Sequence, residues 1–156
     1  MSVASFPTPL GLCLLEGDDH GVSSIQITPE SDRPDDIPTE LFEAVNQMRE
    51  YFDGLRTEFT FKTNPKGTPF QQSVWEKLRS IPFGKTISYL KLASDLGDVK
   101  AIRAVASANA KNPLWIVVPC HRVIGTDGSL TGYAGGLWRK KWLLEHESPS
   151  GQQILF

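Results

Sequence analysis

The strongest constraint on the fold is a set of helix start and stop signals in the middle of the chain. Thr68, Pro69 and Gln71 supply the N-cap, the first helical position and the third position of a capping box. Ser88 predicts the N-cap of a second helix that runs through Leu96. Two short helices separated by a turn are therefore expected in this region.

A third helix and a turn follow these two. Residues 100–111, KAIRAVASANAK, predict the helix, which ends before Pro113. GTDGS at 125–129 is typical of a hairpin turn. Helices and hairpin in this order are the elements of a winged helix-turn-helix. The small residues of the third helix, Ser107 among them, favour either tight packing on its neighbours or entry into a nucleic-acid groove with Arg103 reaching inward.

Upstream of these helices, the sequence predicts a small α/β lobe. Two predicted strands, residues 10–16 and 22–28, form a hairpin with a loop of about five residues. A proline- and aspartate-rich surface connection, residues 29–38, leads to a predicted helix at 41–52 and a third strand at 58–63. NPKG at 64–67 is the candidate linker. The fold class expected is α+β, with a small N-terminal α/β lobe (1–64) followed by a winged helix-turn-helix-like domain (65–156).

Charge divides the chain in the same way. Residues 1–64 hold 4 Lys/Arg and 12 Asp/Glu, whereas residues 65–142 hold 12 Lys/Arg and 4 Asp/Glu. A basic half joined to an acidic half indicates either polyanion binding by one half or two solvated faces of opposite sign. With no long apolar run and no signal-peptide pattern, we expect no membrane association, and a cytoplasmic or nuclear location.

The run WIVVPCHRVIG, residues 115–125, contains the most reactive residue type in the chain. Two cysteines are too few for a disulfide framework, and no Cys or His pair has zinc-finger spacing. Cys120 is then either an inert buried residue or a nucleophile whose pKa His121 and Arg122 would lower. Neighbouring side chains on a strand point to opposite faces. A nucleophile here requires a chain turn at Pro119 or a water that relays the proton.

The C-terminal part adds a glycine-rich loop and an amphipathic helix from about Gly136. Glu145 and Glu147 fall at the end of this helix, where acidic groups oppose the helix dipole. Such a carboxylate is either a solvated side chain at a fraying end or a group that orients a histidine, completing a nucleophile, base and orienter.

These residues resemble the O6-alkylguanine-DNA alkyltransferases, also called methylated-DNA–protein-cysteine methyltransferases. The resemblance covers nearly the whole chain, and PCHRV followed by GYAGG is its most specific part. It implies that Cys120 is the alkyl acceptor, with His121 as base through a water, Glu147 polarising His121, Asn112 fixing the loop and helix, and Tyr89 assisting departure of the base. It also implies that Arg103 fills the space of an extruded nucleotide, that the carbonyls of Cys120 and Val123 read the exocyclic amine, and that the Ala134 amide donates to the alkylated oxygen.

Further contacts to DNA or substrate are expected from Ser107, Trp115, Tyr133 and Gly135. The implied reaction is irreversible, single-turnover transfer from O6-alkylguanine after base flipping, with O4-alkylthymine as a second candidate substrate. It needs no cofactor. The implied partner is double-stranded DNA bound through its minor groove by a monomer. Because the N-terminal lobe offers only Cys13 and His20, we expect no metal. The alternatives are a lesion-binding sensor that does not react, a cysteine hydrolase and a plain winged-helix module.

Overall fold

The computed structural model describes residues 1–29 and 36–148. Its contacts divide the chain into two compact units. The first comprises Met1–Lys66 together with Pro113–Val117, and the second comprises Gly67–Asn112 and the chain from Val118 onward. The division lies close to the predicted boundary after residue 64, although the sequence does not predict that residues 113–117 join the first unit. That each unit is an independent domain stays a prediction.

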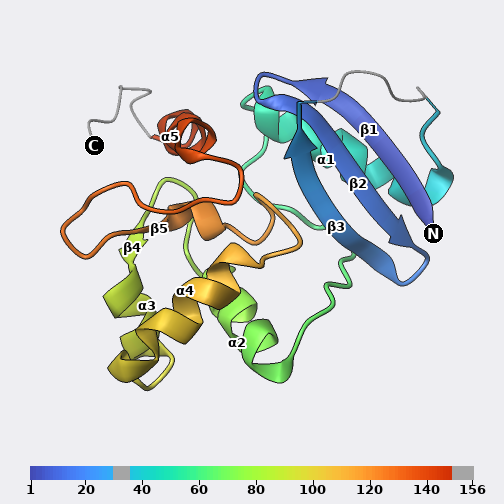
Figure 1. Ribbon diagram of the computed structural model, residues 1–156. Helices are drawn as coiled ribbons and strands as arrows, with labels where there is room; N and C mark the ends of the chain where they lie inside the picture. The colour runs from blue at the N-terminus through green and yellow to red at the C-terminus, as the bar shows by residue number, and fades with distance from the viewer. Residues whose placement is uncertain (30–35, 149–156) are drawn as a thin grey trace. The chain divides into compact units, whose positions relative to one another are not determined.

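The first unit is built on an antiparallel sheet whose strands follow chain order: β1 (Ser2–Thr8), β2 (Gly11–Asp18) and β3 (Gly21–Thr28). Helix α1 (Phe42–Phe52), preceded by a 3₁₀ turn at Thr39–Leu41, covers one face of this sheet (Figure 1). Apolar residues at helical spacing in the turn and the helix, Leu41, Val45 and Met48, are fully buried. The predicted helix is confirmed. The predicted connection at 29–38 lies mostly outside the described residues.

The strands differ from the prediction in three respects. The hairpin is confirmed, but its strands extend to Asp18 and from Gly21, which leaves a two-residue turn instead of a five-residue loop. The sequence analysis missed β1, an edge strand that tolerates Pro7 because an edge position needs no N–H donor. The strand predicted at 58–63 is wrong, since Thr63 makes only an isolated parallel bridge with Val22.

Residues 113–117 run along β3 within the first unit. The Ile25 N–H donates to the Pro113 carbonyl at 2.8 Å, and the Trp115 N–H donates to the Ile25 carbonyl at 3.1 Å. Ile116 then has a φ of 76°, and the Val117 N–H bonds back to the Trp115 carbonyl, as in a γ-turn. This tight turn follows the stretch that is bonded to β3.

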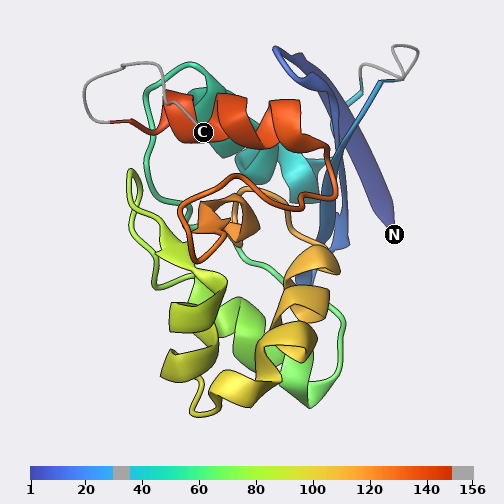
Figure 2. The same ribbon diagram turned by 60° about the vertical axis from the view of Figure 1, so that its left-hand side comes forward.

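The second unit is mainly helical. Its elements are α2 (Pro69–Leu78), β4 (Ile87–Ser88), α3 (Tyr89–Asp95), a 3₁₀ turn at Val99–Ala101, α4 (Ile102–Ala110), a 3₁₀ turn at Cys120–Arg122, β5 (Val123–Ile124) and α5 (Leu137–His146). Figure 2 shows α2, α3 and α4 grouped together, with the Cys120–Arg122 turn between this group and α5. A hydrogen bond of 2.9 Å from Trp75 Nε1 to the Ala108 carbonyl joins α2 to α4.

The predicted helix signals of this unit are confirmed. Thr68 accepts from the Gln71 N–H at 3.1 Å, and the Gln71 side chain accepts from the Thr68 N–H at 2.9 Å. Ser88 caps α3 by accepting from the Lys91 N–H. The hairpin predicted around 125–129 is wrong: the turn forms, with the Gly125 N–H bonded to the Ser129 carbonyl, but β5 pairs in parallel with β4.

No helix within residues 1–29 and 36–148 has the length and hydrophobicity needed to cross a bilayer.

Candidate active site

A pocket of about 460 Å³ opens in the second unit. It is lined by residues of α3, α4, the Cys120 turn and the loop before α5, namely Tyr89, Ala106, Asn109, Ala110, Cys120, Thr131, Gly132, Tyr133 and Ala134. Four of these nine residues, Tyr89, Cys120, Tyr133 and Ala134, are predicted site residues. The fold therefore brings together residues that lie up to 45 positions apart in the sequence.

The chain turns sharply before Cys120. Pro119 has φ −81° and ψ 64°, and the Cys120 N–H donates to the Val118 carbonyl at 2.8 Å, which together make an inverse γ-turn. Asn112 Nδ2 donates to the same Val118 carbonyl at 2.7 Å. These two bonds fix Cys120 at the start of a 3₁₀ turn, so the strand geometry that would oppose Cys120 and His121 does not apply.

The Cys120 thiol is almost completely buried, with 3% of the residue exposed. Burial raises the pKa of Cys120 to about 11, against the opposing effects of a hydrogen bond from Asn112 and the charge of Lys140. The charge that opposes this effect of burial is that of Lys140, and the lowering by the His121 and Arg122 side chains stays a prediction. A group that removes the thiol proton during reaction is therefore required near neutral pH.

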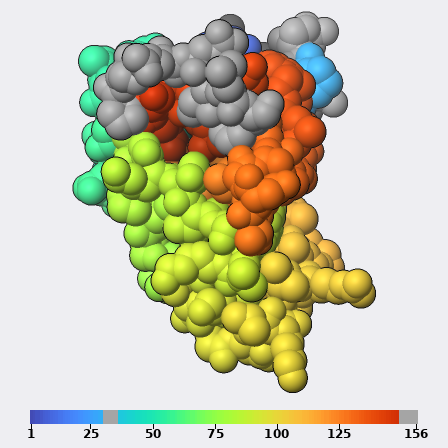
Figure 3. Space-filling view, turned by 90° about the vertical axis from the view of Figure 1, so that its left-hand side faces the viewer, coloured from blue at the N-terminus to red at the C-terminus, as the bar shows by residue number. Residues whose placement is uncertain are grey.

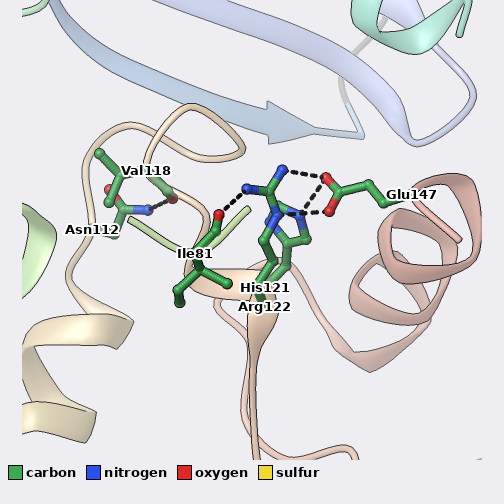
Figure 4. Close-up of polar contacts among 6 residues, drawn as sticks. All are labelled: Ile81, Asn112, Val118, His121, Arg122 and Glu147. Atoms are coloured by element: carbon green, nitrogen blue, oxygen red, sulfur yellow. Dashed lines mark hydrogen bonds and ion pairs between the residues drawn. The ribbon is translucent and has the colours of Figure 1, made fainter. Parts of the chain in front are cut away.

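His121, Arg122 and Glu147 form a buried polar network (Figure 4). His121 Nε2 lies 2.7 Å from Glu147 Oε2. Arg122 holds the same carboxylate with two bonds, Nε to Oε1 at 2.7 Å and Nη2 to Oε2 at 3.0 Å, and it donates to the Ile81 carbonyl through Nη1. Arg122 thus neutralises Glu147. Burial raises the pKa of Glu147, but His121 and Arg122 outweigh it and hold this pKa well below its usual range.

The tautomer of His121 follows from this network. An ionised carboxylate only accepts hydrogen bonds, so His121 Nε2 carries the proton. Nδ1 is then the basic nitrogen, and it is buried with no hydrogen-bond partner among the residues that the structure describes. The geometry leaves His121 able to take a proton at Nδ1, while Glu147 stabilises the imidazolium that forms.

Lys140 is a buried cation that sequence reasoning missed. The side chain on α5 is 0% exposed, and its Nζ donates to the carbonyls of Val123 at 2.6 Å, Thr131 at 2.5 Å and Gly132 at 3.3 Å. Burial lowers the pKa of Lys140 to about 8. Thr131 and Gly132 line the pocket, so Lys140 fixes one wall while its charge favours the thiolate of Cys120. A lysine in an amphipathic helix gives no sequence signal for this role, because most lysines are exposed.

Tyr89 lines the pocket opposite the loop before α5. Its hydroxyl oxygen accepts a hydrogen bond from Asn109 Nδ2 at 3.2 Å. Burial raises the pKa of Tyr89, and the Asn109 bond acts in the opposite direction. Asn109, which sequence reasoning did not single out, lies within the small-residue helix α4 and is buried.

The remaining predicted residues lie in different surroundings. Arg103 and Ser107 are exposed on α4, together with Ala104 and Ala110. Figure 3 shows this segment, in yellow, exposed at one end of the second unit. Gly135 is buried beside the pocket-lining Ala134. Val123 is buried on β5. Trp115 belongs to the first unit and is not one of the residues that line the pocket.

Fold and site define an α+β protein with a buried cysteine in the pocket of a helix-turn-helix-like unit. Residues 69–149 match the family described as 6-O-methylguanine DNA methyltransferase, DNA binding domain. A methylated-DNA–protein-cysteine methyltransferase of Methanosarcina acetivorans is 44% identical over 153 residues, which cover 94% of this chain and 98% of that protein. The chain therefore belongs to the methylated-DNA–protein-cysteine methyltransferases, a family of enzymes, and the resemblance inferred from its motifs is confirmed.

Solved structures agree with this membership and with the α+β fold class. A crystal structure of Mycobacterium tuberculosis OGT in complex with DNA is 41% identical, with a TM-score of 0.84 and coverage of 94% of each chain. A crystal structure of Mycobacterium tuberculosis O6-methylguanine methyltransferase gives a TM-score of 0.83 at 41% identity, covering 93% of this chain and 91% of that one.

Proposed function

We propose that this protein repairs DNA directly by moving the alkyl group of O6-alkylguanine to Sγ of Cys120. The observation that carries the proposal is the position of Cys120, which lines the same pocket as Tyr89 and Ala134. The next residue in the chain is His121, which is paired with Glu147. Its relatives carry the matching enzyme name, and a similar protein was crystallised with DNA.

Activation of the thiol is assigned to His121. Because burial raises the pKa of Cys120 to about 11, the resting thiol is protonated near neutral pH. A water passes its proton to His121 Nδ1, and Glu147 stabilises the resulting imidazolium through the 2.7 Å contact at Nε2. Asn112 and Lys140 stabilise the thiolate as it forms.

On the substrate side, the S–C bond forms as the C–O6 bond breaks, and the electron pair of the broken bond moves into the purine. Tyr89 supplies a proton to the ring, so that neutral guanine leaves. The Ala134 amide donates to O6, while the carbonyls of Cys120 and Val123 accept from the exocyclic amine. The Val123 carbonyl already accepts from Lys140 Nζ, but a carbonyl has two lone pairs and can accept a second bond.

DNA binding is assigned to the exposed side of α4, which enters the minor groove of double-stranded DNA. The protein binds as a monomer. The alkylated oxygen lies on the major-groove edge of the base and cannot be reached from the minor groove while the base is stacked, so the base must be flipped at a cost of a few kcal/mol. Small residues at Ala104, Ser107 and Ala110 permit close approach of the helix, and Arg103 fills the space of the extruded nucleotide. Tyr133 and Gly135 shape the wall of the base pocket, and Trp115 remains a proposed contact.

The product is a thioether, which nothing in this reaction removes. One protein molecule should therefore accept one alkyl group, without a cofactor, because the group comes from DNA and the acceptor is Cys120 itself. The same transfer would apply to O4-alkylthymine.

The test is intact mass before and after mixing with a duplex that contains one O6-methylguanine, followed by peptide mapping. We expect a gain of one methyl group on Cys120, saturating at one per protein and absent in Cys120→Ser. Lesion-selective binding without a mass change would contradict alkyl transfer and identify a damage sensor. Multiple turnovers with water would identify a cysteine hydrolase, and equal binding of intact and alkylated DNA a plain winged-helix module.

A further inference from the structure

Asn109 has one hydrogen-bonded polar atom and one polar atom without a hydrogen-bond partner in the described part of the chain. The residue is 4% exposed and lines the pocket together with Tyr89 and Cys120. Its Nδ2 donates to the Tyr89 hydroxyl at 3.2 Å, whereas its Oδ1 is buried with no hydrogen-bond partner among residues 1–29 and 36–148. A buried amide that serves only the fold normally has both ends bonded. Here the protein bonds only the end that faces Tyr89.

The bond also fixes where the Tyr89 proton can point. An amide nitrogen donates and cannot accept, so the Tyr89 oxygen is the acceptor in this pair. The hydroxyl hydrogen must then point away from Asn109. Both residues line the pocket, which makes the pocket the region available to that hydrogen.

We propose that Asn109 is a positioning residue for alkyl transfer, which aims the Tyr89 O–H at the departing base and stabilises the phenol oxygen as its proton leaves. The inference rests on the proposed function and adds a residue to it. Asn109 does not touch the reacting carbon and acts through Tyr89.

The hydrogen bond from Asn109 to Tyr89 strengthens during the reaction. As the S–C bond forms and the C–O6 bond breaks, Tyr89 gives its proton to the purine and its oxygen becomes negative. The Asn109 bond is then charge-assisted and stronger than in the resting protein. An interaction that strengthens in the transition state accelerates the reaction. Tyr89 afterwards regains a proton from water, and the His121 imidazolium returns the thiol proton to water. Overall, Cys120 loses one proton and guanine gains one.

The experiment compares two reactions of the same thiol in Asn109→Leu, which is close to Asn in size and cannot donate. The first is single-turnover transfer from a duplex containing O6-methylguanine, and the second is alkylation of Cys120 by iodomethane. Iodide leaves without a proton. We expect transfer from DNA to slow on the order of tenfold, the effect of one hydrogen bond, while the iodomethane rate stays within twofold of wild type.

Tyr89→Phe and the double variant test whether Asn109 acts through Tyr89. The two losses should not multiply, because without the hydroxyl Asn109 has nothing to orient. Glu76→Gln, an exposed change on α2 in the same unit, is the control for both reactions. Asn109→Asp, which keeps the shape and as a carboxylate cannot donate, replaces Asn109→Leu if the leucine variant does not fold.

The outcomes separate the inference from the function on which it rests. A wild-type protein that reacts with iodomethane but takes no methyl group from DNA would overturn the proposed function and this inference with it. Normal wild-type transfer with an unaffected Asn109→Leu would overturn the inference alone. Equal slowing of both reactions would show that Asn109 only supports the packing around Cys120, and multiplying losses would show that it does not act through Tyr89.

Discussion

At the residue scale, Lys140 supplies a buried positive charge that favours the thiolate form of Cys120. Lys140→Met removes the ammonium group that favours the Cys120 thiolate, so the pKa of Cys120 should rise further above about 11. We expect alkylation of Cys120 by iodoacetamide to slow several-fold between pH 6 and 8, where Lys140, with its pKa of about 8, still carries its charge. Lys141→Met is the matched control, because this neighbouring lysine is 40% exposed and pairs with Glu145. Equal slowing in both variants would contradict the role of Lys140.

Glu147 is the residue whose loss should cost most in stability. Glu147→Gln leaves buried Arg122 without its carboxylate, which should lower the free energy of unfolding by about 3–5 kcal/mol. Because the folded pKa of Glu147 is lowered, its stabilisation is complete above the unfolded pKa of about 4.3 and declines as the pH falls below that value toward the folded pKa.

Urea unfolding from pH 7 to pH 3 checks this prediction. The difference between wild type and Glu147→Gln should be constant above about pH 5 and shrink below the unfolded pKa. A difference that does not change over the whole range would contradict it.

At the scale of elements, α4 is the helix that the proposed function sets against DNA. Ala104→Glu places a carboxylate on its exposed side, where it would meet phosphates and occupy space that the small residues leave open. We expect duplex affinity to fall at least tenfold in a fluorescence-anisotropy titration at fixed salt. Gln26→Glu, at an exposed position on β3 of the first unit, adds the same charge and should have a small effect. Equal losses would point to net charge instead of helix contact.

The starts of some helices in this chain are specified by neighbouring residues, whereas the first strand is not. Helices α2 and α3 could be predicted because Thr68, Gln71 and Ser88 specify their starts within a few residues. Strand β1 could not, since Pro7 argues against a strand unless the strand is known to lie at an edge.

The site divides in the same way. Motifs single out Cys120, His121 and Glu147, whose roles stay predictions, and the structure places His121 2.7 Å from Glu147. The burial of Lys140 and the partner of Asn109 depend on contacts between distant elements.

At the scale of the molecule, alkylation should weaken the protein. The Cys120 thiol is buried and hydrogen-bonded by Asn112, which also holds the Val118 carbonyl at 2.7 Å. A methyl group on sulfur has to enter this packed site, so we expect the free energy of unfolding to fall by on the order of 1 kcal/mol or more. Thermal unfolding of the methylated protein beside the unreacted one measures it, and an unchanged melting temperature would count against this prediction.

The contacts of residues 113–117 with the first unit affect the order in which the chain can fold during synthesis. The first unit is discontinuous in sequence, because β3 is hydrogen-bonded to Pro113 and Trp115 long after Lys66. A ribosome adds residues from the N-terminus, so this unit cannot complete its contacts until all three helices α2, α3 and α4 have emerged. Synthesis therefore delivers α4, the proposed DNA-contacting helix, before the sheet that precedes it in the chain can be finished. Residues 113–117 then complete the sheet and lead directly to Cys120.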